Sequence, residues 1–185
     1  MSGVPVLETN RLLLRGWRDG DLPELARMYA DPEVMRYIGD GHPRSLEESR
    51  GFFERIRASW AGRGFGLWAA ELKETGRLVG RLGLSVPEFL PEVLPAVEVG
   101  WLIDRPYWGQ GLATEGAEAS LRFAFEELRL ERVLGICDPR NVASERVMQK
   151  LGLVLERRTL EPELGLPLLV YAVTAADWRR RALRS

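Results

Sequence analysis

The sequence has few of the residues that build metal, disulfide or thiol sites. Its 185 residues include a single cysteine, Cys137, and a single histidine, His42. One cysteine cannot form an internal disulfide, and without a Cys/His cluster we expect no metal site. Cys137 lies in an apolar run, so we expect a small buried hydrophobic residue rather than a nucleophile. His42 is either incidental or contributes to substrate binding or to base catalysis.

Long apolar runs and an excess of positive charge are also absent. No uncharged run approaches the roughly 18 residues that a membrane-spanning helix needs, and the first residues lack the pattern of a signal peptide. We therefore expect a cytoplasmic protein without membrane contacts. The formal net charge of −1 argues against nucleic acid as a partner. Length and composition predict one domain over residues 1–185.

The stretch over residues 96–115 carries the strongest local signal. An apolar, β-branched run over 96–103 predicts a strand, and Pro106, Gly109 and Gly111 mark a turn after it. Apolar residues then recur at helical spacing from Leu112. A glycine loop between a strand and a helix can hold a phosphate on the free N–H groups of residues 110–114. The alternative is a tight strand-to-helix turn, because the spacing fits neither a Walker loop nor a dinucleotide fingerprint.

The remaining pattern predicts a mixed α+β protein in which early strands outnumber helices and later helices connect strands. Strands are expected over residues 7–17, 65–72, 78–84, 96–103, 133–138, 153–160 and 168–174. Helices are expected over residues 19–30, 31–37, 45–60, 112–130, 142–151 and 175–183. The helices before residue 60 lie between the first two strands.

The sequence W-G-Q-G-L-A at residues 108–113 resembles the pyrophosphate loop of the GNAT superfamily of CoA-dependent N-acetyltransferases. The family pattern is Gln/Arg-x-x-Gly-x-Gly/Ala, which Gly111 and Ala113 match. Trp108 in its first position is similar to the RimJ/RimL-type branch, which acetylates the N-termini of ribosomal proteins. Further matches are E-T-N-R-L-L-L-R near the start, N-V-A-S-E-R-V-M-Q-K-L-G-L, and V-T-A-A-D-W near the end. The resemblance runs from about residue 7 to 178.

This resemblance implies a fold, a co-substrate and a set of contacts. The implied fold is a central, mostly antiparallel, seven-stranded sheet that splays between strands four and five and is flanked by helices. Acetyl-CoA would lie in the splay, and the acceptor would be the N-terminal α-amine of a protein, in a possible homodimer. The residues implied to bind acetyl-CoA are Trp101, Leu102, Ile103, Trp108, Gly109, Gln110, Gly111, Leu112, Ala113, Thr114, Asn141 and Ser144.

Glu98 is the candidate general base. It is a charged residue between Val97 and Val99 in an apolar strand, where burial would raise its pKa and make it a better proton acceptor near neutrality. The alternative is that it points outward on an alternating strand or pairs with an arginine. The resemblance favours the catalytic role, because many GNAT enzymes carry a Glu at this point, acting directly or through a water.

The general acid is less well defined. Asn141 and Ser144 match the Asn-x-x-Ser of the family, in which the Asn binds pantetheine, although both could simply cap a helix. Many relatives have a tyrosine at the position of Met148, which cannot donate a proton. Ser144 is therefore the candidate acid, unless the reaction uses none.

Two alternatives to a protein acceptor remain. A small amine such as a polyamine, an aminoglycoside or an amino acid would keep the same chemistry. An acidic pocket would favour polycations, and the acids that could form one are Asp31, Glu33, Asp40, Glu47 and Glu48. They could equally be surface charges. The other alternative is a non-catalytic acyl-CoA-binding regulatory protein, consistent with Met148 at the tyrosine position.

Overall fold

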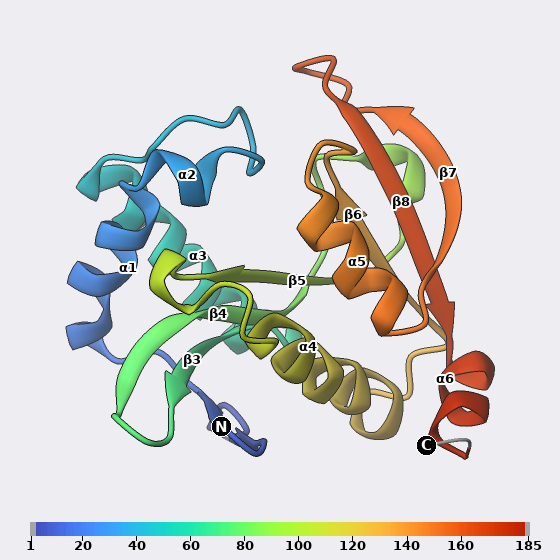
Figure 1. The fold of residues 1–185 in the computed structure, drawn as a ribbon, viewed down its shortest axis with the longest axis horizontal. Coiled ribbons are helices and arrows are strands. Elements are labelled where there is room, and N and C mark those ends of the chain that lie inside the picture. The colour runs from blue at the N-terminus through green and yellow to red at the C-terminus, as the bar shows by residue number, and fades with distance from the viewer. Residues whose placement is uncertain (1–2, 184–185) are drawn as a thin grey trace.

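The computed structural model describes residues 3–183 as one twisted sheet with helices on both faces (Figure 1). The strand order is β1-β2-β3-β4-β5-β6-β8-β7. The strands are β1 (Leu7–Glu8), β2 (Leu12–Arg15), β3 (Leu67–Leu72), β4 (Arg77–Ser85), β5 (Glu98–Ile103), β6 (Arg132–Cys137), β7 (Val154–Leu160) and β8 (Pro167–Thr174). The helices are α1 (Leu22–Tyr29), α2 (Pro32–Met35), α3 (Leu46–Arg63), α4 (Leu112–Arg122), α5 (Val142–Lys150) and α6 (Ala175–Ala182).

The first strand differs from the prediction. The expected strand over residues 7–17 is broken into β1 and β2, which pair antiparallel, so the sheet has eight strands instead of seven. The break is a turn closed by Thr9, whose N–H donates to Leu12 O at 2.9 Å while its Oγ1 accepts from Leu12 N at 2.8 Å. A threonine side chain that bonds the backbone in this way offers the chain a turn in place of a continuing strand.

The sheet opens between β5 and β6. All other neighbouring strands are antiparallel, whereas β5 and β6 are parallel and share the single register pair Glu98–Leu134. Beyond that pair the two strands diverge, as the crossing directions of β5 and β6 in Figure 1 show. The predicted splay is confirmed, and it falls between these two strands because the broken first strand shifts the numbering by one.

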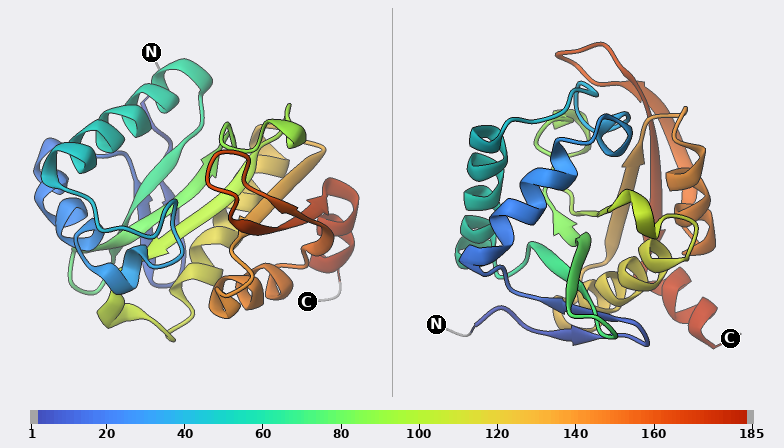
Figure 2. Two further views of the ribbon diagram at one scale, coloured as in Figure 1. Left: turned by 90° about the horizontal axis from the view of Figure 1, so that it is seen from above. Right: turned by 60° about the vertical axis from the view of Figure 1, so that its left-hand side comes forward.

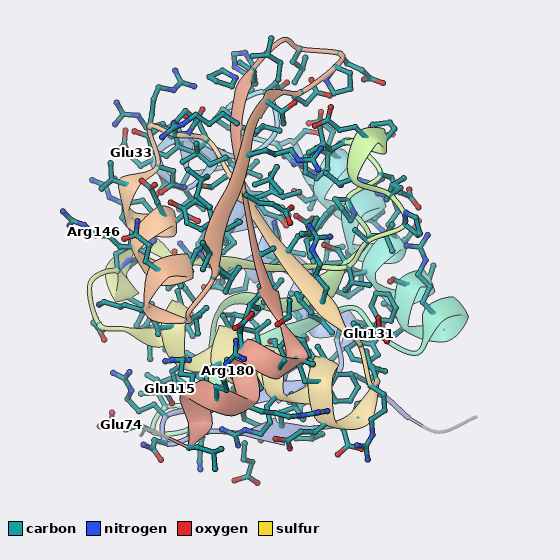
Figure 3. All side chains as sticks on the ribbon, turned by 90° about the vertical axis from the view of Figure 1, so that its right-hand side faces the viewer. Glu33, Glu74, Glu115, Glu131, Arg146 and Arg180 are labelled. Carbon is teal, nitrogen blue, oxygen red and sulfur yellow. The ribbon has the colours of Figure 1, made fainter. Side chains whose placement is uncertain are left out.

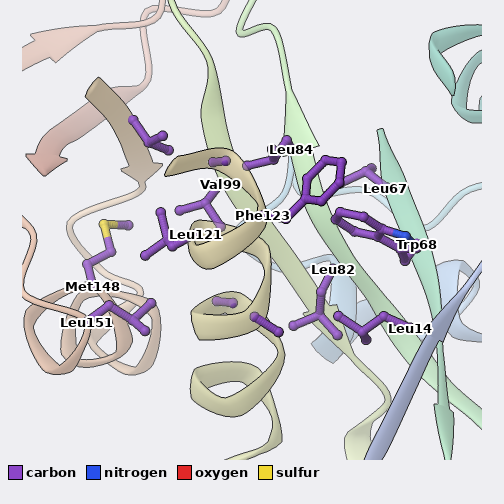
Figure 4. Packing of buried hydrophobic residues seen from close by; sticks show 14 of the residues in the cluster. Leu14, Leu67, Trp68, Leu82, Leu84, Val99, Leu121, Phe123, Met148 and Leu151 are labelled. Atoms are coloured by element: carbon purple, nitrogen blue, oxygen red, sulfur yellow. The ribbon is translucent and has the colours of Figure 1, made fainter. Parts of the chain in front are cut away.

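Helix α4 fills the angle between the two halves of the sheet. Leu121 is buried between Val99 of β5 and Met148 of α5, and Phe123, just after α4, packs on Trp68 of β3 with ring centroids 5.2 Å apart (Figure 4). The helical pattern predicted to residue 130 is α-helical only to Arg122 and continues as a π-helical turn over Phe123–Glu127. The closeness of α4 to the sheet depends on Gly116, since a Cβ there would lie 2.8 Å from a Leu82 methyl carbon.

The opposite face of the first half-sheet is covered by α1, α2 and α3 (Figure 2). Helix α3 begins with a capping box, in which Ser45 Oγ accepts from Glu48 N and Glu48 accepts from Ser45 N. Helix α2 is shorter than predicted and ends at Met35. None of the helices between residues 3 and 183 is long and apolar enough to cross a membrane.

Candidate functional site

A cleft of about 480 Å³ opens where the two halves of the sheet separate. It lies between α2, the end of β5, the loop after β5, the start of α4, and α5. Every residue predicted to bind the co-substrate lines it except Gln110. The lining residues are Glu33, Val34, Arg36, Tyr37, Ile38, Trp101, Leu102, Ile103, Tyr107, Trp108, Gly109, Gly111, Leu112, Ala113, Thr114, Asn141, Ala143, Ser144, Arg146, Val147 and Lys150.

The loop before α4 presents backbone donors to this cleft. Gly109 and Gly111 have φ angles of +73° and +80°, in the left-handed region that favours glycine. Gly111 is the N-cap of α4, and the helical hydrogen bonds begin with Glu115 N donating to Gly111 O at 3.1 Å. The N–H groups of residues 112–114 therefore lie outside the helical ladder. Together with the positive end of the helix dipole they can receive an anion.

A carboxylate at the start of α4 braces this loop. Glu115 accepts hydrogen bonds from Thr9 Oγ1 (2.6 Å), Arg11 N (2.7 Å) and Arg11 Nε (2.7 Å), and Arg11 Nη1 also donates to Gln110 O at 2.8 Å. Burial tends to raise the pKa of Glu115, but these bonds outweigh it and the pKa is lowered. Periodicity and loop composition missed this brace, although Thr9 and Arg11 belong to the E-T-N-R segment of the resemblance.

The aromatic and amide side chains of the loop hold its own shape. Trp108 Nε1 donates to Ile103 O at 2.6 Å, and Gln110 Nε2 donates to Pro106 O at 3.2 Å. Tyr107 is partly buried against the main core. Tyr107 and Trp108 therefore pack the loop, and both also contribute to the cleft wall. The side chain of Gln110 bonds within the loop, so only its backbone N–H is left for the predicted contact with acetyl-CoA.

Glu98 lies at the first position of β5, outside the cleft wall. Trp101 lines the cleft three residues further along the strand, about 10 Å away at the usual rise of a strand. Glu98 is partly buried, and its Oε1 accepts from Ser85 Oγ at 3.0 Å. Burial raises its pKa to about 7, although the Ser85 hydroxyl and the charge of Arg81 act to lower it. Among residues 3–183 no ion pair to Glu98 forms, so the alternative of a paired carboxylate is not observed.

Asn141 and Ser144 line the cleft at the start of α5, and Met148 does not. Asn141 Oδ1 accepts from Ser144 N at 3.1 Å, so the capping role that the sequence also allowed is present. Met148 is 1% exposed and packs into the core beside Gly135, where a Cβ would lie 2.9 Å from its sulfur. The three residues therefore do not form one cleft-facing set, and Ser144 remains the only hydroxyl among the candidate acids.

The cleft wall also carries three basic residues, one just after α2 and two in α5, that the sequence did not single out. Arg36, Arg146 and Lys150 contribute positive charge to its wall, and Glu33 lies 3.7 Å from Arg36. Figure 3 shows Glu33 and Arg146 on the same side of the molecule. This excess of positive charge suits an anionic ligand.

The remaining candidates lie elsewhere or serve the fold. Cys137 is buried, and burial raises the pKa of its thiol to about 12, which leaves it unreactive near neutrality, as expected. His42 is exposed in a loop outside the cleft wall. Of the acids proposed for an acidic pocket, three accept hydrogen bonds from nearby backbone N–H groups: Asp31, Asp40 and Glu48.

Comparisons with known proteins agree with this geometry. A family model described as "Acetyltransferase (GNAT) domain" matches residues 11–154. "Uncharacterized protein YkkB" of Bacillus subtilis (strain 168) is 33% identical over 154 residues, covering 83% of this chain and 87% of that protein. "FsC-acetyl coenzyme A-N(2)-transacetylase" of Aspergillus fumigatus is 30% identical over 191 residues, covering 97% of this chain and 80% of that protein.

Solved structures give the same picture. The acetyltransferase from Agrobacterium tumefaciens str. C58 superposes with a TM-score of 0.79 at 30% identity, covering 94% of this chain and 96% of that one. RimL, named as a ribosomal L7/L12 alpha-N-protein acetyltransferase in complex with coenzyme A, gives a TM-score of 0.74 at 19% identity and covers 92% of this chain and 97% of that one. At that identity the likeness to RimL concerns the fold alone.

Proposed function

The chain belongs to the GNAT acetyltransferase family and is an acyl-CoA-dependent N-acetyltransferase, and on that premise we propose that it acetylates a protein N-terminal α-amine. The acceptor is the finer part of the proposal and rests on the W-G-Q-G-L-A loop of the RimJ/RimL type. We further propose that residues 1–185 act as one domain, with acetyl-CoA and amine bound together in a ternary complex.

The cleft and the raised pKa of Glu98 support the site of the reaction. In the proposal, the N–H groups of residues 112–114 receive the pyrophosphate, and Arg36, Arg146 and Lys150 add positive charge beside it. The pantetheine arm follows β5 past Trp101 toward Glu98, with Asn141 and Ser144 on the opposite wall. Bound acetyl-CoA supplies the acetyl thioester at the Glu98 end of the strand.

The observation that carries the proposal is a carboxylate with a raised pKa at the closed end of the splay, where β5 and β6 still pair. A protonated amine has no lone pair, so a base must take its proton before or during attack. Glu98, with a pKa of about 7, can do so near neutral pH. The amine nitrogen then bonds to the acetyl carbon as the carbon–sulfur bond breaks. The departing thiolate takes up a proton, for which Ser144 is the proposed donor, and the second proton that the nitrogen loses as the amide forms restores the Ser144 hydroxyl.

A small amine is the second candidate acceptor. The Aspergillus relative at 30% identity is named for acetyl transfer to an N(2) position, with no protein acceptor in its name. Polycations fit less well, because Arg36, Arg146 and Lys150 outnumber Glu33 among the charged residues of the cleft wall. Amino acids therefore rank above polyamines and aminoglycosides among small acceptors.

A thiol-release assay with acetyl-CoA tests the proposal directly. The acceptors would be peptides with N-terminal Ser, Ala or Met, together with free amino acids, polyamines and aminoglycosides. Turnover of peptides supports the proposal, and turnover confined to small amines keeps the chemistry but replaces the acceptor. If calorimetry shows acetyl-CoA binding while no amine is acetylated, the non-catalytic binding protein becomes the better reading. Mass spectrometry of the product would locate the acetyl group.

A further inference from the structure

The face of the sheet that carries Glu98 also carries an arginine. In the β4–β5 ladder, Ser85 pairs with Glu98, Gly83 with Gly100, and Arg81 with Leu102. Paired residues and every second residue point to the same face, so Glu98 and Arg81 share the face covered by α1 and α3. Between them lie two glycines, and a Cβ on Gly100 would meet open space. No side chain therefore stands on the sheet at the two positions between the Glu98 carboxylate and the Arg81 guanidinium.

Arg81 belongs to a cluster of guanidinium and aromatic groups. Its Nε donates to Tyr29 Oη at 2.6 Å, and its Cζ lies 5.1 Å from the centre of the Phe52 ring. Arg44 Cζ lies 5.2 Å from the same ring and 5.2 Å from Tyr29, and Arg55 Cζ lies 5.6 Å from Phe52. Stacking on aromatic rings holds the guanidinium planes in place and leaves their N–H edges available.

This cluster has positive charge without a matching carboxylate. Over residues 3–183, no Asp or Glu oxygen lies within 4 Å of a guanidinium nitrogen of Arg44, Arg55 or Arg81. Arg44 and Arg81 are nevertheless partly buried. The buried Arg15, in contrast, is matched, since it pairs with Asp21 at 2.7 Å and with Glu71 at 2.6 Å. A fixed, partly desolvated and unpaired guanidinium pair suits an anion from outside the chain.

We propose that Arg44 and Arg81, supported by Tyr29 and Phe52, bind a carboxylate of the acceptor whose amine is placed at Glu98. The acceptor class is then a primary amine that also carries a carboxylate, either a free amino acid or a peptide with an acidic residue next to its N-terminus. This inference rests on the proposed function, because it assumes that Glu98 marks the amine position. It assigns the specificity of the acceptor side, which the cleft residues do not determine.

The phosphates of the co-substrate are the competing explanation for the cluster. None of Arg44, Arg55 and Arg81 lines the cleft, whereas Arg36, Arg146 and Lys150 do. The loop at Gly111 lies beyond the far end of β5 from Glu98, and Arg81 contacts α1 and α3 rather than α4 or α5. The cluster therefore faces the acceptor side of the sheet. Acetyl-CoA affinity should not depend on it.

The test compares acceptors that differ only by a carboxylate. One pair is glutamate and glutamine, and the other is two peptides that carry Asp or Asn as the second residue. Thiol release gives kcat/KM for each acceptor with wild type, Arg81→Gln and Arg44→Gln. Arg77→Gln, on the same strand and exposed, is the matched control for loss of one positive charge. Calorimetry with acetyl-CoA and thermal unfolding accompany each variant.

We expect wild type to prefer the acidic member of a pair by roughly 10- to 100-fold, the range of a charge-assisted hydrogen bond. Arg81→Gln and Arg44→Gln should remove that preference while acetyl-CoA affinity holds, and Arg77→Gln should retain it. A preference for the acidic acceptor in only one of the two pairs shows whether the carboxylate belongs to a free amino acid or to a peptide. The inference would be overturned if wild type used the acidic and neutral acceptors of a pair at equal kcat/KM, or if the variants lost the same factor in kcat/KM on both. Weakened acetyl-CoA binding in the variants would also overturn it. Each of these results would leave the proposed acetyltransferase activity intact. Absence of turnover on every acceptor would instead overturn the proposed function.

Discussion

At the scale of single residues, the chemistry depends on how Glu98 is kept ready to accept a proton. Its pKa of about 7 results from burial against the partial relief given by Ser85 and Arg81. A carboxylate at this value is about half ionised at neutral pH, whereas an exposed glutamate is a much weaker base. The environment of the strand therefore matters as much as the residue type.

Glu98→Gln should lower kcat/KM by roughly 10²- to 10⁴-fold, the usual contribution of a general base. In wild type the base form exists above the pKa, so kcat/KM should rise through pH 7 and then level off. The variant should lack that inflection and keep its acetyl-CoA affinity. Steady-state rates from pH 5.5 to 8.5 check this. An unchanged profile in the variant would remove Glu98 from the mechanism.

The same pKa predicts a cost in stability. Because the folded pKa of about 7 exceeds the ordinary glutamate pKa of 4.5, the folded state holds the Glu98 proton more tightly than the unfolded state does. The stabilisation that the bound proton gives to the folded state is complete below about pH 4.5 and is lost as the pH rises through 7. The free energy of unfolding of Glu98→Gln should therefore rise relative to that of wild type as the pH goes from 5 to 8. The rise should be on the order of 1 to 2 kcal/mol, a reduced figure because Glu98 is only partly buried. Chemical denaturation of both proteins at the two pH values measures the difference. A difference independent of pH would contradict the raised pKa.

At the scale of elements, the brace between the first turn of the chain and α4 fixes the loop that faces the cleft. Glu115→Gln removes the charge that Arg11 and Thr9 bind, and Arg11 then holds Gln110 O less firmly. We expect acetyl-CoA affinity to fall by about 1 to 2 kcal/mol, or roughly 5- to 30-fold. Calorimetry gives the dissociation constants. Glu118→Gln, on the same helix 3.6 Å from Arg181, is the control and should bind as wild type does.

Elements were predictable where the signal was local. The loop at Gly109 and Gly111, the capping box at Ser45 and the strand beginning near Glu98 all follow from spacing and turn chemistry within a few residues. The break in the first strand was not, because the polar residues 8–11 carry no glycine or proline to mark a turn and only the bonds of the Thr9 side chain reveal it. The π-helical turn after α4 was not predictable either, because the hydrogen bonds change there while the apolar spacing continues.

Only some residues of the cleft wall were predictable, because the others depend on contacts between distant parts of the chain. The loop and α5 were identified from sequence motifs, but Arg36 and Arg146 come from helices more than 100 residues apart. Which helices face one another depends on the packing of the two half-sheets, and the periodicity of each helix does not encode it. For the acids near α2, composition left a pocket and plain surface charge equally open, and the bonds of Asp31 and Asp40 depend on backbone geometry that composition does not show.

At the scale of the whole molecule, two half-sheets depend on a single helix for their connection. They share one register pair, yet the main core joins both, with Leu82 and Val99 on one side of α4 and Met148 and Leu151 on the other (Figure 4). Leu121 is fully buried between them. Leu121→Ala should cost about 2 to 5 kcal/mol, and the halves should still unfold in a single transition. Calorimetry checks this, and two separate transitions would show that the halves are independent domains.

The opening between the halves also predicts how the co-substrate acts on stability. A ligand in the cleft contacts β5 and α4 on one side and α5 on the other, so it would bridge parts that share few backbone bonds. Acetyl-CoA at 100 times its dissociation constant should add about 2.7 kcal/mol to the free energy of unfolding. Hydrogen exchange should slow at residues 101–103 and in the first turn of α5 together. Gly111→Val forces a side chain into a φ of +80°, so it should lose both effects while its own fold persists. Protection confined to one half would show that the ligand does not bridge the splay.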